Sequence, residues 1–172
     1  GKWIAFISNR SEEPDANSNS DIWALSTVTR EARPSLRQIT TNPGSDTNPA
    51  WSPDGKVLAH VTITQPDLIW HAGRKLAIST FAGGRAEILT ADLDRNVSQP
   101  RFDPDGKALY FRAEDGRVYH LARLELENRR LTRPLGEKLN VSSFTMSPAS
   151  RLAVLKSEPH QPNEVFLLDN LP

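Results

Sequence analysis

The chain has 172 residues, which is the usual size of one domain and enough to bury a hydrophobic core. Its 21 basic and 21 acidic residues give a formal net charge of zero, so the chain lacks the excess positive charge that favours nucleic acid or an anionic membrane. No stretch approaches the roughly 18 consecutive apolar residues of a membrane span. Without cysteine there is no disulfide, thiolate metal site or cysteine nucleophile. The compartment stays open between cytoplasm and periplasm.

One four-residue turn recurs along the chain. Pro-Asp-Gly-Lys occurs at 53–56 and 104–107, the chain opens on Gly-Lys, and Ser-Pro-Ala-Ser at 147–150 is a degenerate copy. Aligned on the turn glycine, the copies fall at residues 1, 55, 106 and 150, at intervals of 44 to 54 residues. A four-stranded propeller blade takes roughly 40–50 residues. The spacing therefore fits one blade per copy, with insertions in the first two units.

Each unit contains the same succession of apolar segments, rich in Ile, Val, Leu and aromatic residues and with the two-residue period of a strand. No segment has a helical period over about ten residues. The expected strands are 48–51, 98–102 and 141–146 before the turn, then 3–8, 57–62, 108–113 and 151–157, then 21–26, 75–80, 117–124 and 164–169, and finally 36–40, 86–90 and 129–132, which close on threonine.

The turn chemistry predicts hairpins. Pro53 presets φ at the second position of a type I turn, and Gly55 then accepts the left-handed conformation. This is the sequence of a three-residue hairpin loop with a bulge, and residues 103–106 repeat it. Ser150 replaces the glycine in the last copy, so we expect a longer or strained turn there.

These observations predict an all-β, partial β-propeller of about three to four antiparallel blades, at roughly 1–40, 41–90, 91–132 and 133–172. Closed propellers contain about 4–8 blades. The first unit lacks its leading strand and turn, and the last stops before a fourth strand. We therefore expect a fragment of a larger ring, which self-associates through the apolar faces of its end blades.

The units resemble the propeller repeats of two families. Residues 47–62, TNPAWSPDGKVLAHVT, are similar to the repeats of the translocation protein TolB. Residues 73–116, 117–132 and 144–169 resemble the N-terminal propeller of the prolyl oligopeptidase family of serine peptidases, in particular its acylaminoacyl-peptidase and dipeptidyl-peptidase-like branch.

The two resemblances imply different functions. The peptidase resemblance implies a propeller that gates and shapes a cavity for peptide substrates, which a hydrolase domain outside this chain would cleave. The resemblance to TolB implies a non-enzymatic propeller that binds a partner protein. Neither implies a cofactor.

Catalytic residues are not expected in this chain. The peptidases carry their nucleophile in a Gly-x-Ser-x-Gly elbow, and none of the nine glycines brackets a serine in that way. Of the four histidines, no two are spaced for a metal, and His60 and His120 lie inside expected strands, where packing or a hydrogen bond is the expected role.

The polar insertion at 9–20 contains two candidate sites. The run DANSNSD at 15–21 alternates like the first ligands of a calcium loop, but Ser20 and Ser26 stand where the turn glycine and the bidentate glutamate belong, which favours a solvated loop. Glu12 and Glu13 resemble the paired glutamates with which dipeptidyl-peptidase relatives hold the substrate amino group, although the residues around them differ. The alternative is a surface charge pair.

The insertion at 63–75 carries Trp70 and Arg74. An exposed tryptophan beside cationic side chains suits recognition of a peptide or a carboxylate. The alternative is that Trp70 caps a blade face. We keep Trp70, Arg74, Glu12 and Glu13 as candidate substrate-binding residues.

Overall fold

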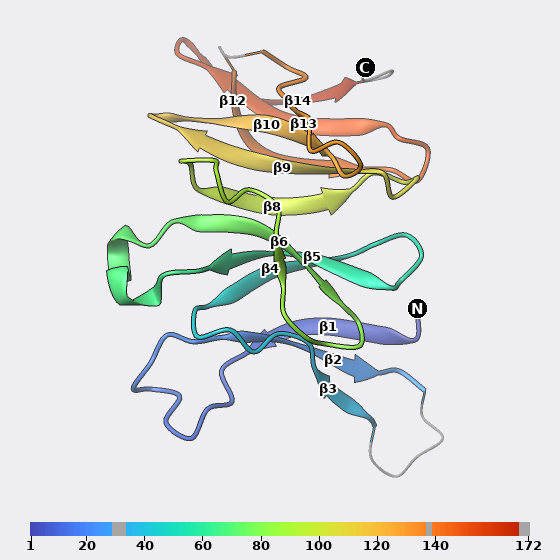
Figure 1. The fold of residues 1–172 in the computed structure, drawn as a ribbon. Helices are drawn as coiled ribbons and strands as arrows, with labels where there is room; N and C mark the ends of the chain where they lie inside the picture. Colours follow the sequence, from blue (N-terminus) through green and yellow to red (C-terminus); the bar gives the residue numbers. More distant parts are fainter. Residues whose placement is uncertain (29–33, 137–138, 169–172) are drawn as a thin grey trace.

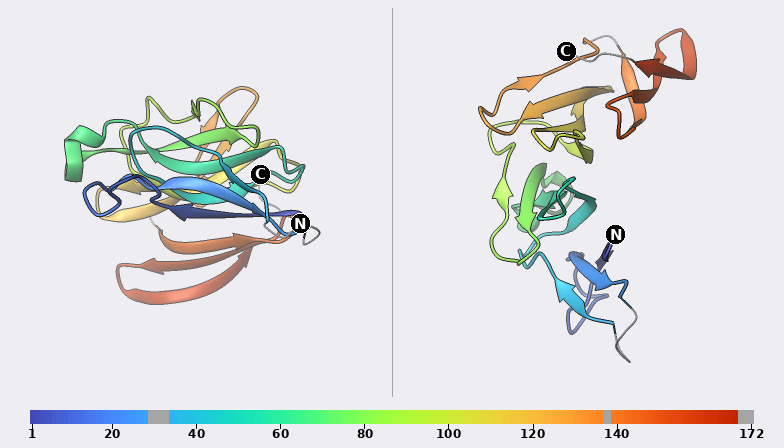
Figure 2. Two further views of the ribbon diagram at one scale, coloured as in Figure 1. Left: turned by 90° about the horizontal axis from the view of Figure 1, so that it is seen from below. Right: turned by 90° about the vertical axis from the view of Figure 1, so that its right-hand side faces the viewer.

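The structure is a computed structural model that describes residues 1–28, 34–136 and 139–168. Its strands form four antiparallel sheets, in which every strand pairs with its neighbours in sequence. The sheets succeed one another in chain order (Figure 1), and they follow an open curve in the side view (Figure 2). The prediction of an all-β partial propeller is confirmed. Among the described residues, no helix has the length and apolar character needed to cross a bilayer.

The sheets differ in strand number. The first contains β1 (Trp3–Ser8), β2 (Asp21–Ser26) and β3 (Leu36–Gln38), and the second contains β4 (Asp46–Trp51), β5 (Val57–Ile63), β6 (Arg74–Thr80) and β7 (Glu87–Ile88). The third contains β8 (Val97–Phe102), β9 (Ala108–Asp115), β10 (Val118–Glu125) and β11 (Leu131–Thr132), and the fourth contains β12 (Asn140–Met146), β13 (Leu152–Glu158) and β14 (Gln161–Leu168). A 3-10 segment, η1 (Pro66–His71), projects between β5 and β6.

The closing strand of each of the first three units is shorter than the sequence predicted. β3, β7 and β11 have only two or three residues each, where five, five and four were expected. The closing threonines explain part of the difference in the first two sheets. Thr40 and Thr90 lie beyond the strand ends, and their hydroxyl oxygens accept the backbone N–H of Ile22 and Leu76 at 2.9 Å. A side chain therefore replaces the backbone ladder there.

The recurring turns have the predicted chemistry but not the predicted length. Gly55 has φ +70°, and its N–H donates to the carbonyl of Ser52 at 2.9 Å, as a type I turn followed by a left-handed residue requires. The next bonded pair is Ser52 with Val57, so residues 53–56 form a four-residue loop. The Ser52 hydroxyl accepts the N–H of Val57 at 3.1 Å in place of a backbone carbonyl. The turn after Asp103 has the same length without a serine, since Asp103 donates its N–H to the carbonyl of Ala108 at 2.9 Å.

The last turn is strained, as expected, but it is shorter rather than longer. Ser147 donates its N–H to the carbonyl of Arg151, so only residues 148–150 lie in the loop. Ser150 takes the glycine position with φ 59°, a conformation that costs a residue with a Cβ about 1–2 kcal/mol.

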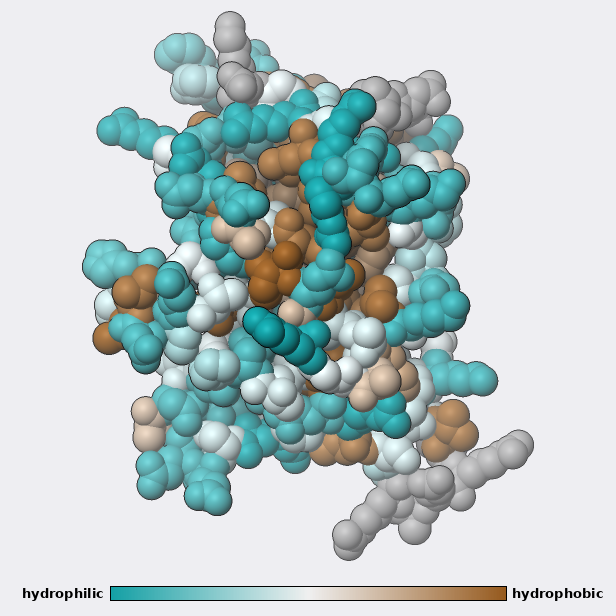
Figure 3. All heavy atoms as spheres, in the orientation of Figure 1, coloured by the Kyte–Doolittle hydropathy of each residue, from teal (hydrophilic) through white to brown (hydrophobic). Residues whose placement is uncertain are grey.

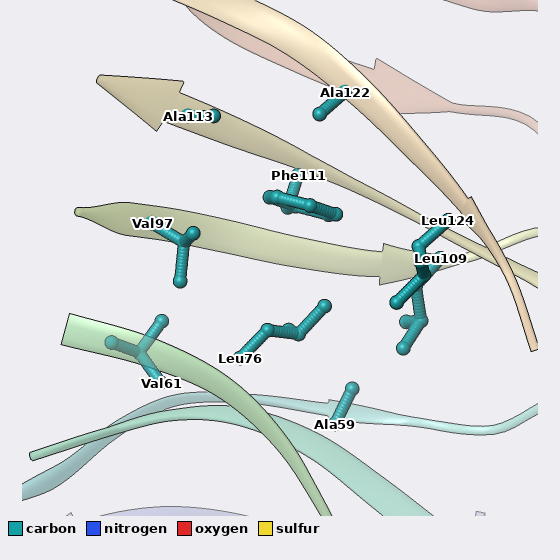
Figure 4. Close-up of a cluster of buried hydrophobic side chains, with 9 residues drawn as sticks. All are labelled: Ala59, Val61, Leu76, Val97, Leu109, Phe111, Ala113, Ala122 and Leu124. Carbon is teal, nitrogen blue, oxygen red and sulfur yellow. The ribbon is translucent and has the colours of Figure 1, made fainter. Parts of the chain in front are cut away.

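The hydrophobic core consists of three layers between successive sheets. Apolar side chains show through a mostly hydrophilic surface near the middle of the face in Figure 3. Figure 4 shows the layer between the second and third sheets, formed by Ala59, Val61, Leu76, Val97, Leu109, Phe111, Ala113, Ala122 and Leu124. Tyr110, Leu121, Val141, Phe144, Leu152 and Val154 join the third and fourth sheets, and Ile22, Ala24, Ile39 and Leu58 join the first and second. Each inner sheet is thus buried on both faces.

The strain at Ser150 can be tested by exchange with glycine. We expect Ser150→Gly to raise the free energy of unfolding by about 0.5–1 kcal/mol, because glycine adopts positive φ without a steric penalty. The matched exchange, Gly106→Ser, should lower it by about 1 kcal/mol. Urea unfolding of the chain measures both, and a loss of stability in Ser150→Gly would contradict the strain.

Candidate functional site

The insertion between β5 and β6 forms one wall of a groove of about 730 Å³. The groove is lined by Ala16, Asn17, Ser18, Asn19, Pro43, Gly44, Ser45, Thr47, Val61, Ile63, Pro66, Asp67, Ile69, Trp70, Ala72 and Arg74. Two of the candidate residues, Trp70 and Arg74, are therefore brought together. Trp70 is 94% exposed, so it is not packed against a sheet of this chain.

The tip of this insertion is apolar, exposed and strained. Leu68 and Ile69 are exposed beside Trp70, and apolar side chains project at the left edge of Figure 3, where Figure 1 shows η1. Ile69 has φ 50° and ψ −108°, which a β-branched residue seldom adopts. Exposed apolar groups and backbone strain together are typical of ligand-binding loops.

The opposite wall of the groove belongs to the polar insertion at 9–20. Asn9 holds this loop together, because its amide nitrogen donates to the carbonyl of Pro14 and to the side chain of Asn17, both at 2.9 Å. Glu12 and Glu13 are exposed in the same loop but do not line the groove. The structure thus separates the glutamates from Trp70 and Arg74.

The calcium-like run at 15–21 is occupied by contacts within its own loop. The Asn17 side-chain oxygen accepts the N–H of Asn19 at 3.0 Å, and its amide nitrogen donates to the Ser11 hydroxyl at 3.1 Å. In the part of the chain that the structure describes, no group of three or more His, Asp or Glu side chains is arranged to hold a metal ion.

A second groove, of about 510 Å³, lies between the second and third sheets. Its charges are largely compensated. Asp115 accepts hydrogen bonds from Arg95 at 3.0 Å and from Arg133 at 3.1 Å, and these bonds, Arg95 first, lower the pKa of the Asp115 carboxyl. The compensation favours a structural role for this cluster.

Asp46, His60 and Ser79 form a row between the first and second sheets. His60 Nε2 lies 2.9 Å from the Ser79 hydroxyl, and His60 Nδ1 lies 3.2 Å from Asp46 Oδ1, a close contact that is not a directed hydrogen bond. The order is that of a serine-hydrolase triad. The side chains of Asp46 and His60 are fully buried, however, and Ser79 is only 2% exposed. No substrate can reach this serine, so the row is structural.

Comparison of the sheets shows how unusual this row is. With the sheets aligned on Trp51 and Phe102, the third sheet has Val97 where the second has Asp46, and Phe111 where it has His60. Sequence reasoning gave His60 a packing or hydrogen-bonding role, which its contact with Ser79 bears out, but it missed Asp46 and Ser79. A position-by-position comparison of the repeats would have found Asp46, because the equivalent positions are apolar.

No family model matches the sequence. The uncharacterized peptidase YuxL of Bacillus subtilis is 30% identical over 109 residues, which are 63% of this chain and 15% of that protein. Dipeptidyl-peptidase 5 of Aspergillus fumigatus is 29% identical over 126 residues, 67% of this chain and 17% of that protein. The chain spans less than a fifth of the length of these two relatives.

Several solved structures have the same fold. The putative TolB from Agrobacterium tumefaciens matches 98% of this chain and 58% of its own, with a TM-score of 0.73 and 20% identity. Acylaminoacyl peptidase from Pyrococcus horikoshii matches 97% of this chain and 24% of its own, with a TM-score of 0.72 and 17% identity. The β-propeller domain of the Trilobed protease from Pyrococcus furiosus matches 96% and 46%, with a TM-score of 0.68 and 14% identity. The predicted resemblance to the two kinds of propeller is confirmed.

The role of the buried row can be tested by replacing it with the residues of the third sheet. We expect Asp46→Val alone to lower the free energy of unfolding by about 1–3 kcal/mol, because it leaves His60 buried without a carboxylate beside it. His60→Phe alone should also lower it by about 1–3 kcal/mol, because it leaves the polar side chains of Asp46 and Ser79 buried without the imidazole beside them. The double variant reproduces the Val97–Phe111 pair and should recover most of this loss.

Urea unfolding of the two single variants and the double variant measures the coupling between the positions. Strictly additive losses would show that Asp46 and His60 do not act as a pair.

Proposed function

We propose that this chain is part of the propeller of a prolyl-oligopeptidase-family serine peptidase, in which it gates and shapes the cavity that receives peptide substrates. The observation that carries the proposal is the 30% identity with a peptidase over 109 residues. The propeller fold shared with acylaminoacyl peptidase supports it. Hydrolysis is assigned to a domain outside this chain, since the Asp46–His60–Ser79 row is buried.

The groove beside η1 is the part of this chain that we assign to the peptide. Trp70 offers an exposed ring for apolar side chains, and Arg74 offers a cation on the same wall. The backbone N–H of Arg74 donates to the Asn96 side chain at 2.9 Å, which fixes the base of the insertion. Glu12 and Glu13, on the neighbouring loop, would take a peptide amino group only after a movement of that loop.

The coding frame that contains this chain tests the proposal directly. We expect it to continue beyond Pro172 into an α/β-hydrolase domain of about 250 residues with a Gly-x-Ser-x-Gly elbow. A frame that encodes no hydrolase domain would contradict the peptidase assignment.

In the encoded enzyme, Trp70→Ala and Arg74→Ala should each raise KM for peptides about 3- to 10-fold with little effect on kcat. The exposed Arg117, in the turn between β9 and β10 and outside the groove, offers a control, Arg117→Ala, which should leave KM unchanged.

A TolB-like propeller that binds a partner protein is the second candidate. The observation that favours it is the TM-score of 0.73 to the putative TolB, of which this chain covers a larger share than it does of the peptidases. The same reading of the coding frame distinguishes the two candidates. If the chain belongs to a TolB-like protein, the frame should encode further blades and no nucleophile elbow.

We further propose that the chain by itself associates with a second copy through its end sheets. Ile4 is 56% exposed on the first sheet, whereas Leu58 and Leu109, which occupy the same position in the next two sheets, are fully buried. At the other end, Val165 is 74% exposed, and its equivalent Leu76 is fully buried. These end faces are therefore built like internal faces but lack a covering sheet.

Light scattering on the isolated chain measures this association. We expect a dimer or larger species at high concentration, which the double variant Ile4→Lys/Val165→Lys should return to a monomer. A wild-type chain that stays a monodisperse monomer would contradict the proposal.

A further inference from the structure

Arg112 on β9 is held by two contacts from different sheets. Its Nε donates to the carbonyl of Val141 on β12 at 2.9 Å, across the layer between the third and fourth sheets. Its guanidinium carbon lies 4.1 Å from the centre of the Tyr119 ring on β10. The hydrogen bond and the cation–π contact together fix the plane of the guanidinium.

The guanidinium has no acidic partner among the described residues. Arg123, the other half-buried arginine among the described residues, binds Glu125, and the exposed Arg95 and Arg133 both bind Asp115. Burial lowers the pKa of Arg112 below its ordinary value, and only the Tyr119 phenol opposes that shift. A partly buried charge without a counter-ion is unfavourable unless an anion joins it.

Packing does not explain an arginine at this position. With the sheets aligned on their turns, Arg112 corresponds to Val61 in the second sheet and to Leu155 in the fourth. Val61 is buried in the layer between the second and third sheets. The second and fourth sheets therefore have an apolar residue at this position, whereas the third sheet has the positively charged Arg112.

We propose that Arg112 is a carboxylate-binding site for a peptide. With Nε bonded to Val141, the two Nη groups have no hydrogen-bond partner in the described part of the chain, and they can bind the two oxygens of one carboxylate. That carboxylate is either the C-terminus of a peptide or an acidic side chain. The site shares no lining residue with the groove of Trp70, and it stands whether or not the chain belongs to a peptidase.

Titration of the chain with N-acetyl-triglycine, followed by NMR at the Arg112 Nε–Hε signal and the Tyr119 ring, tests the site. We expect saturable shifts in the millimolar range, typical of one charge-assisted contact. The C-terminal amide of the same peptide should bind at least about tenfold more weakly, because it lacks the charge. Equal binding of the acid and the amide, or no binding of the acid, would overturn the proposal.

Variants separate a binding site from a structural brace between the two sheets. Arg112→Gln should weaken binding of N-acetyl-triglycine about tenfold, and Arg112→Lys, which keeps the charge but loses the paired donors, should weaken it less. The control is Arg101→Gln on β8, which should leave the affinity unchanged, because within the described residues the Arg101 side chain bonds only the carbonyl of Pro100.

If Arg112→Gln does not fold, Arg112→Lys alone decides the question. Affinity unchanged in Arg112→Lys, with the same affinity for the amide, would make Arg112 a brace. A second probe, N-acetyl-glutamyl-glycinamide, carries its only carboxylate on the side chain. Tighter binding of this probe than of N-acetyl-triglycine would identify an acidic side chain as the natural ligand, and weaker binding would identify a C-terminus.

Discussion

The structure depends on one constraint, which is that every internal sheet must bury two apolar faces. A sheet of the second or third unit has large apolar side chains on both sides, such as Leu58 facing back along the chain and Val61 facing forward. Only a further sheet on each side removes both faces from water. The constraint imposes a succession of sheets, and it leaves the outer faces of the first and fourth sheets exposed at Ile4 and Val165.

The three layers between the sheets differ in chemistry although the backbone repeats. The cluster that fills the layer between the second and third sheets is apolar, although the buried His120 lies on the same face of β10 as its members Ala122 and Leu124. Each outer layer contains a polar exception, the Asp46–His60 contact in the first and Arg112 in the third. Asp46 and His60 lie against each other with fully buried side chains, so no ligand can reach them. Arg112 is only half-buried and has no acidic partner among the described residues, and this difference makes Arg112 a candidate for binding while His60 is not.

The two insertions form the surface features that the repeated sheets do not share. A hairpin turn such as 52–56 only reverses the chain, whereas the segments at 9–20 and 63–75 extend beyond the sheets and form a groove between them. The sheets supply a rigid base for this groove, and the loops supply the exposed Trp70. The solved structures of a putative TolB and of acylaminoacyl peptidase share this fold, so differences in function are expected to lie in such loops.

The sequence by itself determined the strands, their antiparallel order and the hairpin turns, because alternation of apolar residues and the left-handed preference of glycine are local properties. It did not determine the length of the turns, because the strand register beside Ser52, Asp103 and Ser147 decides that. The sequence also could not show that Trp70 and Arg74 line one groove. Nor could it show that Glu12 and Glu13 lie outside that groove. Whether a polar side chain such as His60 or Arg112 finds a partner depends on which residues a neighbouring sheet places opposite it, and only the tertiary structure decided that.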